Sequence, residues 1–157
     1  MEEVVGRLLK EKNKKVAVYE DVTGGMLAER LQQASPSHFV EGIIGPGPAP
    51  MRRLLAFSRR GAKLDELAQE PSSLTGELAW CVRAQAESDL GLALHALPDP
   101  QDKTINMARG QTYVAVTDGK ACKNMTYGVA GRSHPDRMRM SLSALELLRS
   151  ALLEGIA

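Results

Sequence analysis

Two parts of the chain hold the residue types that could carry out chemistry. The first is Glu20-Asp21-Val22-Thr23-Gly24-Gly25, in which two carboxylates and a hydroxyl precede a Gly-Gly pair. A carboxylate can act as a nucleophile or a general base, and a helix that begins at glycines presents free backbone N–H groups to an anion. The second is His95, which ends an apolar run. Together they suggest either a hydrolytic centre or a binding site for an anionic ligand.

Each of these residues also has an interpretation that requires no chemistry. Asp21 or Thr23 can cap the helix that follows, with the glycines only turning the backbone. We expect capping to be the main role of Asp21, where its charge would also repel the phosphate of a nucleotide. A histidine that ends an apolar strand, as His95 does, is more often a hydrogen-bonded core residue. Both interpretations stay open at both positions.

Composition narrows the classes of function. The chain has 157 residues, 43% of them apolar, and a formal net charge of +1, which gives no reason to expect bulk binding to nucleic acid or membrane. The basic run Arg52–Lys63 could contact phosphates, but such a run is more often a solvated helix face, and we interpret it so. Neither a membrane span nor a signal-peptide layout is recognisable, which predicts a cytoplasmic protein. Cys81 and Cys122 are expected to be reduced and buried. The histidines and acidic residues lack metal-ligand spacing, so we expect no metal and no cofactor.

The elements that must position these residues follow from apolar periodicity. Strands are predicted at 15–20, 38–45, 89–96, 112–116 and 121–129, with the last two joined as a hairpin by Asp118-Gly119. Helices are predicted at 3–10, 24–33, 51–57, 74–86 and from Ser133 through Leu152, with a weak helical turn at 63–69. Gly45–Pro50 holds three prolines and two glycines, so we expect an extended surface loop there. Leu97–Arg109 is expected to be a polar loop.

The alternation of these elements predicts one α/β domain over residues 1–157. Its expected architecture is a three-layer α/β/α sandwich around a mixed, mostly parallel five-stranded sheet. In such sheets ligands bind beyond the carboxyl ends of the parallel strands. Three segments are expected to converge at that edge: Glu20–Gly25, Gly45–Met51 and His95–Asp99.

The order and spacing of these three segments resemble the CinA C-terminal family, the nicotinamide-nucleotide amidases. The resemblance extends from about Glu3 to Leu153. In that family a first strand runs into Glu-Ser-x-Thr-Gly-Gly, where this chain has Glu20–Gly25. The second family motif, Tyr-Ser-Asn-x-x-Lys, falls on Pro46–Met51. The other landmarks of the family fall on Arg53-Leu54-Leu55, Ala96-Leu97-Pro98-Asp99-Pro100, Gly110-Gln111-Thr112-Tyr113, Gly131 and Arg137.

The resemblance implies hydrolysis of nicotinamide mononucleotide to the nicotinate nucleotide and ammonia. In the family the motif serine is the apparent nucleophile and the motif lysine is placed to activate it. Here the serine position is Asp21, the tyrosine position is Pro46 and the lysine position is Met51. Methionine cannot accept a proton, and proline has neither a side-chain donor nor a backbone N–H. We therefore predict a catalytically degenerate member with no catalytic residues, and lean against its being an enzyme.

Three functions are compatible with this prediction. The first is a non-catalytic role in binding or assembly, with a homo-oligomer expected because the family tends to oligomerise. The second is an active amidohydrolase on nicotinamide mononucleotide or a related amide, with chemistry rebuilt on Asp21 and His95. The third is a module that binds a nucleotide-like small molecule without chemistry. Partners of nucleic acid or membrane are not expected. The candidate ligand-binding residues are Glu20, Asp21, Thr23, Gly24, Gly25, His95 and Arg137.

Overall fold

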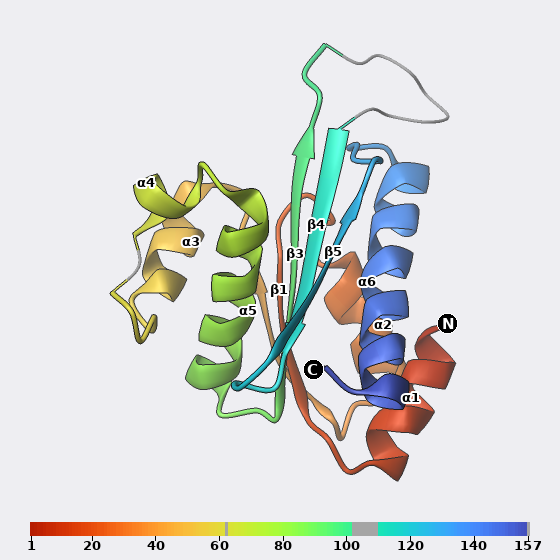
Figure 1. The fold of residues 1–157 in the computed structure, drawn as a ribbon. Coiled ribbons are helices and arrows are strands. Elements are labelled where there is room, and N and C mark those ends of the chain that lie inside the picture. Colours follow the sequence, from red (N-terminus) through yellow and green to blue (C-terminus); the bar gives the residue numbers. More distant parts are fainter. Residues whose placement is uncertain (62, 102–109, 157) are drawn as a thin grey trace.

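A computed structural model of the chain describes residues 1–61, 63–101 and 110–156 (Figure 1). Five strands form one sheet in the order β2-β1-β3-β4-β5. β1 (Val16–Glu20) runs parallel to β2 (Phe39–Ile44) on one side and to β3 (Leu90–Pro98) on the other. β4 (Gly110–Thr117) is antiparallel to β3 and to β5 (Cys122–Tyr127). The predicted mixed sheet and its closing hairpin are confirmed.

Helices cover both faces of the sheet, as the three-layer prediction requires (Figure 1). One face carries α1 (Glu2–Glu11), α2 (Met26–Ala34) and α6 (His134–Glu154). The other face carries α3 (Pro48–Leu55) and α5 (Pro71–Ala86), with the short α4 (Leu64–Leu67) beside them. None of the helices in the described ranges is both long and apolar enough to cross a bilayer.

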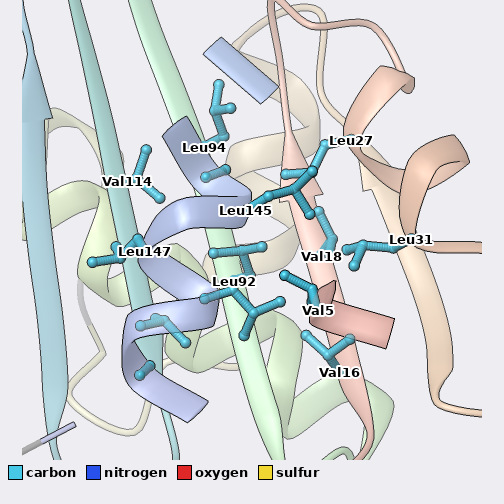
Figure 2. Close-up of a cluster of buried hydrophobic side chains, with 14 of the residues drawn as sticks. Val5, Val16, Val18, Leu27, Leu31, Leu92, Leu94, Val114, Leu145 and Leu147 are labelled. Carbon is cyan, nitrogen blue, oxygen red and sulfur yellow. The ribbon is translucent and has the colours of Figure 1, made fainter. Parts of the chain in front are cut away.

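The alternation of side chains along β1 assigns them to two separate cores. Val16 and Val18 belong to the cluster shared with α1, α2 and α6 (Figure 2), whereas Ala17 and Tyr19 belong to the cluster under α3 and α5. All five side chains of β1 are buried, which explains why its first three residues are aliphatic and why the carboxylate of Glu20 needs hydrogen-bond donors. The same alternation separates the next two side chains, Glu20 and Asp21, onto opposite sides of the sheet.

The proline-rich segment is more ordered than its composition predicts. We expected Gly45–Pro50 to be an extended loop, and this is wrong for its second half, because α3 begins at Pro48. The first-turn N–H groups of a helix have no intrahelical partner, so Pro48 and Pro50 cost the helix no hydrogen bond there. As a consequence, Met51 lies on the helix and faces the core, with 8% of its surface exposed.

The two cysteines are free, but only one is buried. Cys81 of α5 is fully buried, and burial, followed by the charge of Glu77, raises its pKa to about 12. Cys122 is exposed, so the expectation of burial is wrong for it. It lies on the edge strand β5 opposite Gly76, which has no side chain to cover it.

The connection after β3 is only partly described. We expected a loop from Leu97, but β3 continues through Pro98, where it still pairs with β4. Residues 99–101 form a described turn, and the remainder of the expected loop, 102–109, lies outside the described residues.

Candidate functional site

A buried carboxylate holds the corner between β1 and α2. Glu20 has no exposed surface, and its two oxygens accept four hydrogen bonds. The donors are Thr23 Oγ1 (2.5 Å) and the backbone N–H groups of Gly25 (2.9 Å), Leu27 (3.2 Å) and Ala28 (2.7 Å). Because these N–H groups form the positive end of the α2 dipole, they stabilise the negative charge that burial would otherwise disfavour. Glu20 is therefore the cap of α2.

Asp21 lies on the other side of this corner and does not cap the helix. Its Oδ2 lies 2.7 Å from His95 Nδ1, and its Oδ1 accepts hydrogen bonds from the N–H groups of Ala96 (3.0 Å) and Val22 (2.6 Å). The prediction that Asp21 caps α2 is wrong, because strand alternation directs Glu20 and not Asp21 toward the helix. Asp21 instead joins the end of β1 to the second half of β3.

His95 is held in one orientation by two neighbours. Its ring is 7% exposed and stacks on Tyr113 of β4, with the ring centroids 6.2 Å apart and an interplanar angle of 27°. With the ring proton on Nδ1, which donates it in a hydrogen bond to Asp21 Oδ2, Nε2 is the ring nitrogen that carries the lone pair. Within the described part of the chain, Nε2 has no hydrogen-bond partner. His95 is therefore a hydrogen-bonded core residue, and it also has the geometry of a base that a carboxylate orients.

Tyr19 is a member of this group that the sequence analysis missed. Its side chain is fully buried, and its hydroxyl has no hydrogen-bond partner among the described residues. The charge of Asp21 nevertheless acts on this hydroxyl. Burial, and after it the charge of Asp21, raise the pKa of the Tyr19 phenol, which therefore stays protonated. A tyrosine two residues before Asp21 in an otherwise aliphatic strand was the available signal, because both side chains face the same side.

The second predicted segment reaches the same edge but supplies no polar group from its motif positions. The N–H of Gly45 donates to the Glu20 carbonyl at 2.8 Å, which confirms that the segments after β1 and β2 converge. Pro46 is exposed, and Met51 packs in the core with Tyr19 and Leu54. At the position that the resemblance assigns to a lysine, the site therefore has an apolar side chain.

Arg137 of α6 approaches the glycine turn from the opposite face of the sheet. Gly24 and Gly25 have φ values of +63° and +102°, and a Cβ on Gly24 would lie 3.7 Å from Arg137 Nη1. The Nε atom of Arg137 is buried and unpartnered within the described residues. The predicted ligand-binding residues thus form two groups, the Asp21–His95 pair and the Glu20 cap with Arg137 above it. Among the described residues no cluster of three or more His, Cys, Asp or Glu is arranged to hold a metal.

The fold and this corner define an open α/β domain whose candidate site lies at the carboxyl ends of its parallel strands. Residues 1–152 match the family model described as the CinA C-terminal domain. The chain belongs to this family. It is 31% identical over 157 residues to a CinA-like protein of Sulfurihydrogenibium sp. (strain YO3AOP1), covering 99% of this chain and 39% of that protein. A CinA-like protein of Geobacter sulfurreducens is 30% identical, with 95% of this chain and 36% of that protein covered. The chain thus spans less than half the length of these relatives.

Solved structures support the same fold. A CinA superfamily protein of Klebsiella pneumoniae superposes with a TM-score of 0.80 at 18% sequence identity, covering 97% of this chain and 95% of that one. The competence/damage inducible protein CihA of Agrobacterium tumefaciens gives a TM-score of 0.72 at 17% identity, covering 98% and 95%. At these identities the likeness concerns the fold.

The hydrogen bonds of Glu20 lead to a stability prediction. In Glu20→Gln an amide replaces a carboxylate oxygen, so one or more buried N–H groups lose their acceptor or meet another donor. We expect the free energy of unfolding to fall by about 2–3 kcal/mol, measured by urea denaturation followed by circular dichroism. The matched control is Glu29→Gln, an exposed glutamate of α2, for which we expect a loss of about 0.5 kcal/mol. Equal losses in the two variants would contradict the capping role.

Proposed function

We propose that this CinA-like domain does not hydrolyse nicotinamide mononucleotide and acts instead as a non-catalytic binding or assembly protein. The observation that carries the proposal is the state of Asp21, which stands where the resemblance places the nucleophile. Its two oxygens are already engaged by two backbone N–H groups and by His95. A carboxylate tied in this way, with 8% of its surface exposed, is a poor nucleophile because attack would break the bonds that hold the corner together.

The position expected for the activating lysine supports the same proposal. Met51 is buried in an apolar cluster and cannot accept a proton. Pro46, at the tyrosine position, cannot donate a hydrogen bond from either its side chain or its backbone. With neither residue able to carry a proton, the serine–lysine chemistry that the resemblance implies has no substitute at the same positions.

The test is an ammonia-release assay with nicotinamide mononucleotide at high protein concentration. We expect no turnover above the buffer blank, and no difference between the wild-type protein and Asp21→Ala. A family member that retains the serine and lysine motifs serves as the positive control under the same conditions. Wild-type turnover that disappears in Asp21→Ala would overturn the proposal.

One observation favours a second candidate, an amidohydrolase with rebuilt chemistry. His95 Nδ1 lies 2.7 Å from Asp21 Oδ2, and Nε2 has no partner among the described residues. A histidine oriented by a carboxylate in this way has the arrangement of a general base that activates water. The same assay distinguishes the two candidates. If this second function is correct, the wild type releases ammonia, and both Asp21→Asn and His95→Gln lose that activity while their thermal unfolding stays cooperative.

For the binding role we propose a nucleotide-like small molecule at the Gly24–Gly25 turn, with its phosphate on Arg137. The support is the position of the Arg137 guanidinium, which lies over the turn with a buried Nε that has no described partner. We expect calorimetry to detect binding of a mononucleotide, and Arg137→Gln to weaken it about tenfold. The control is Arg149→Gln, an exposed arginine further along α6, which should leave the affinity unchanged. Absence of heat and of a thermal shift at millimolar mononucleotide would exclude this ligand class.

For the assembly role we propose a homo-oligomer. The sheet ends in two edge strands, β2 and β5, and Val40 and Ile44 of β2 expose apolar side chains. Light scattering coupled to size-exclusion chromatography measures the mass in solution directly. We expect a multiple of the chain mass of 17.0 kDa, and a monomeric mass at all concentrations would refute self-association.

A further inference from the structure

A hollow separate from the Asp21–His95 pair lies between α5 and the β4–β5 hairpin. Its volume is about 240 Å³. α5 contributes one wall through Ser72, Glu77 and Trp80, and the hairpin contributes the other through Lys120 and Asn124. The hairpin turn follows Thr117, which pairs with Gly91 near the start of β3, whereas His95 lies in the second half of that strand.

The charge lining this hollow is predominantly positive. Arg59, Arg60 and Lys120 all line it, and none of them forms an ion pair with a carboxylate in the described part of the chain. The single carboxylate in the lining is that of Glu77, which is 8% exposed and accepts a hydrogen bond from Ser58 Oγ at 2.7 Å. Three cations therefore surround a concave surface with one buried acid, an arrangement that attracts a multiply charged anion.

Trp80 holds one of these arginine side chains in place. The Arg59 guanidinium lies 4.8 Å from the centroid of the indole ring, within the range of a cation–π interaction. The indole Nε1 donates to the Gly119 carbonyl at 3.3 Å, which joins the ring to the hairpin turn. The guanidinium of Arg83 lies 5.7 Å from the same centroid. Two guanidinium groups therefore lie close to the indole ring that lines the hollow.

We propose that this hollow binds the phosphate group of a small phosphate monoester. A monoester carries close to two negative charges at neutral pH. Three cations that form no ion pair with a described carboxylate attract this double charge more strongly than the single charge of a carboxylate. The planar guanidinium groups of Arg59 and Arg60 can each donate two parallel hydrogen bonds to phosphate oxygens. The volume of about 240 Å³ lies below the usual range for pockets of drug-sized ligands, which favours a small ligand. Recognition through phosphate alone also implies that the base of a nucleotide contributes little here.

The test uses Trp80 itself, the one tryptophan of the chain, as the reporter. The full chain is titrated with ribose 5-phosphate at constant ionic strength while the Trp80 fluorescence is recorded. We expect a saturable change, a similar apparent affinity for adenosine monophosphate and no response to adenosine. Inorganic phosphate is titrated in parallel. Binding of both ligands would show that the phosphate group itself is recognised, and binding of ribose 5-phosphate alone would show that the organic part is also required.

Substitutions separate binding from general charge effects. We expect Arg60→Gln and Lys120→Gln each to weaken binding about tenfold. Arg59→Gln should do the same in calorimetry, the method chosen for it because this arginine contacts the reporter. The matched control is Arg53→Gln, an exposed arginine that does not line the hollow, which should leave the affinity unchanged. Arg137→Gln should also have no effect, which keeps this result separate from binding at the Gly24–Gly25 turn.

Four outcomes would overturn the proposal. They are the absence of a saturable change at millimolar ribose 5-phosphate, an equal response to sulfate at the same ionic strength, an equal response to adenosine, and an equal loss of affinity in Arg53→Gln and Arg60→Gln. The second and the fourth would show an unspecific effect of positive charge, and the third would show recognition of the base.

Discussion

The hydrogen bonds that the Glu20 carboxylate accepts determine the geometry of the whole candidate site. A fully buried carboxylate is strongly unfavourable unless donors surround it, and here a hydroxyl and three N–H groups of the α2 corner do so. These bonds fix where β1 stops and where α2 begins. They also require the backbone to pass through Gly24 and Gly25 at positive φ, which non-glycine residues adopt only with strain. The position of every neighbouring group follows from this corner.

Because successive side chains of a strand point to opposite faces, Asp21 must face away from α2 once Glu20 faces it. It points to the face of α3 and α5, where His95 and Tyr19 come from positions of the same parity on their strands. The pair Asp21–His95 then joins two parallel strands at their carboxyl ends, the edge where open α/β sheets bind ligands. The same two side chains therefore hold the strands together and could also act as a carboxylate-oriented base. For this reason the geometry alone is compatible with both a binding function and a rebuilt hydrolase.

The sequence allowed the fold and the convergence of three segments to be predicted, because strand runs and the Asp118-Gly119 turn depend on local patterns. It did not allow the roles within Glu20-Asp21 to be assigned. Either carboxylate can cap a helix, and a one-residue difference in where the strand ends exchanges their faces. The prediction of a loop at Pro48 and Pro50 was wrong for a related reason. Proline is disfavoured in the interior of a helix but is tolerated in its first turn. Tyr19 was overlooked because an aromatic residue in a strand is ordinarily a core residue.

The net charge of the chain does not predict which ligands it can bind, because local structure determines where the charged groups lie. A formal net charge of +1 gives no reason to expect strong attraction to polyanions, yet it is a sum over groups that are distributed unevenly in space. Around Trp80 the fold brings together Arg59 and Arg60 from the segment after α3 with Lys120 from a hairpin sixty residues later in the sequence. Their nearest acid in the lining, Glu77, is buried and hydrogen-bonded. Because screening limits exposed charges to a range of roughly 10 Å, this local excess, and not the total, is the charge that a small anion meets.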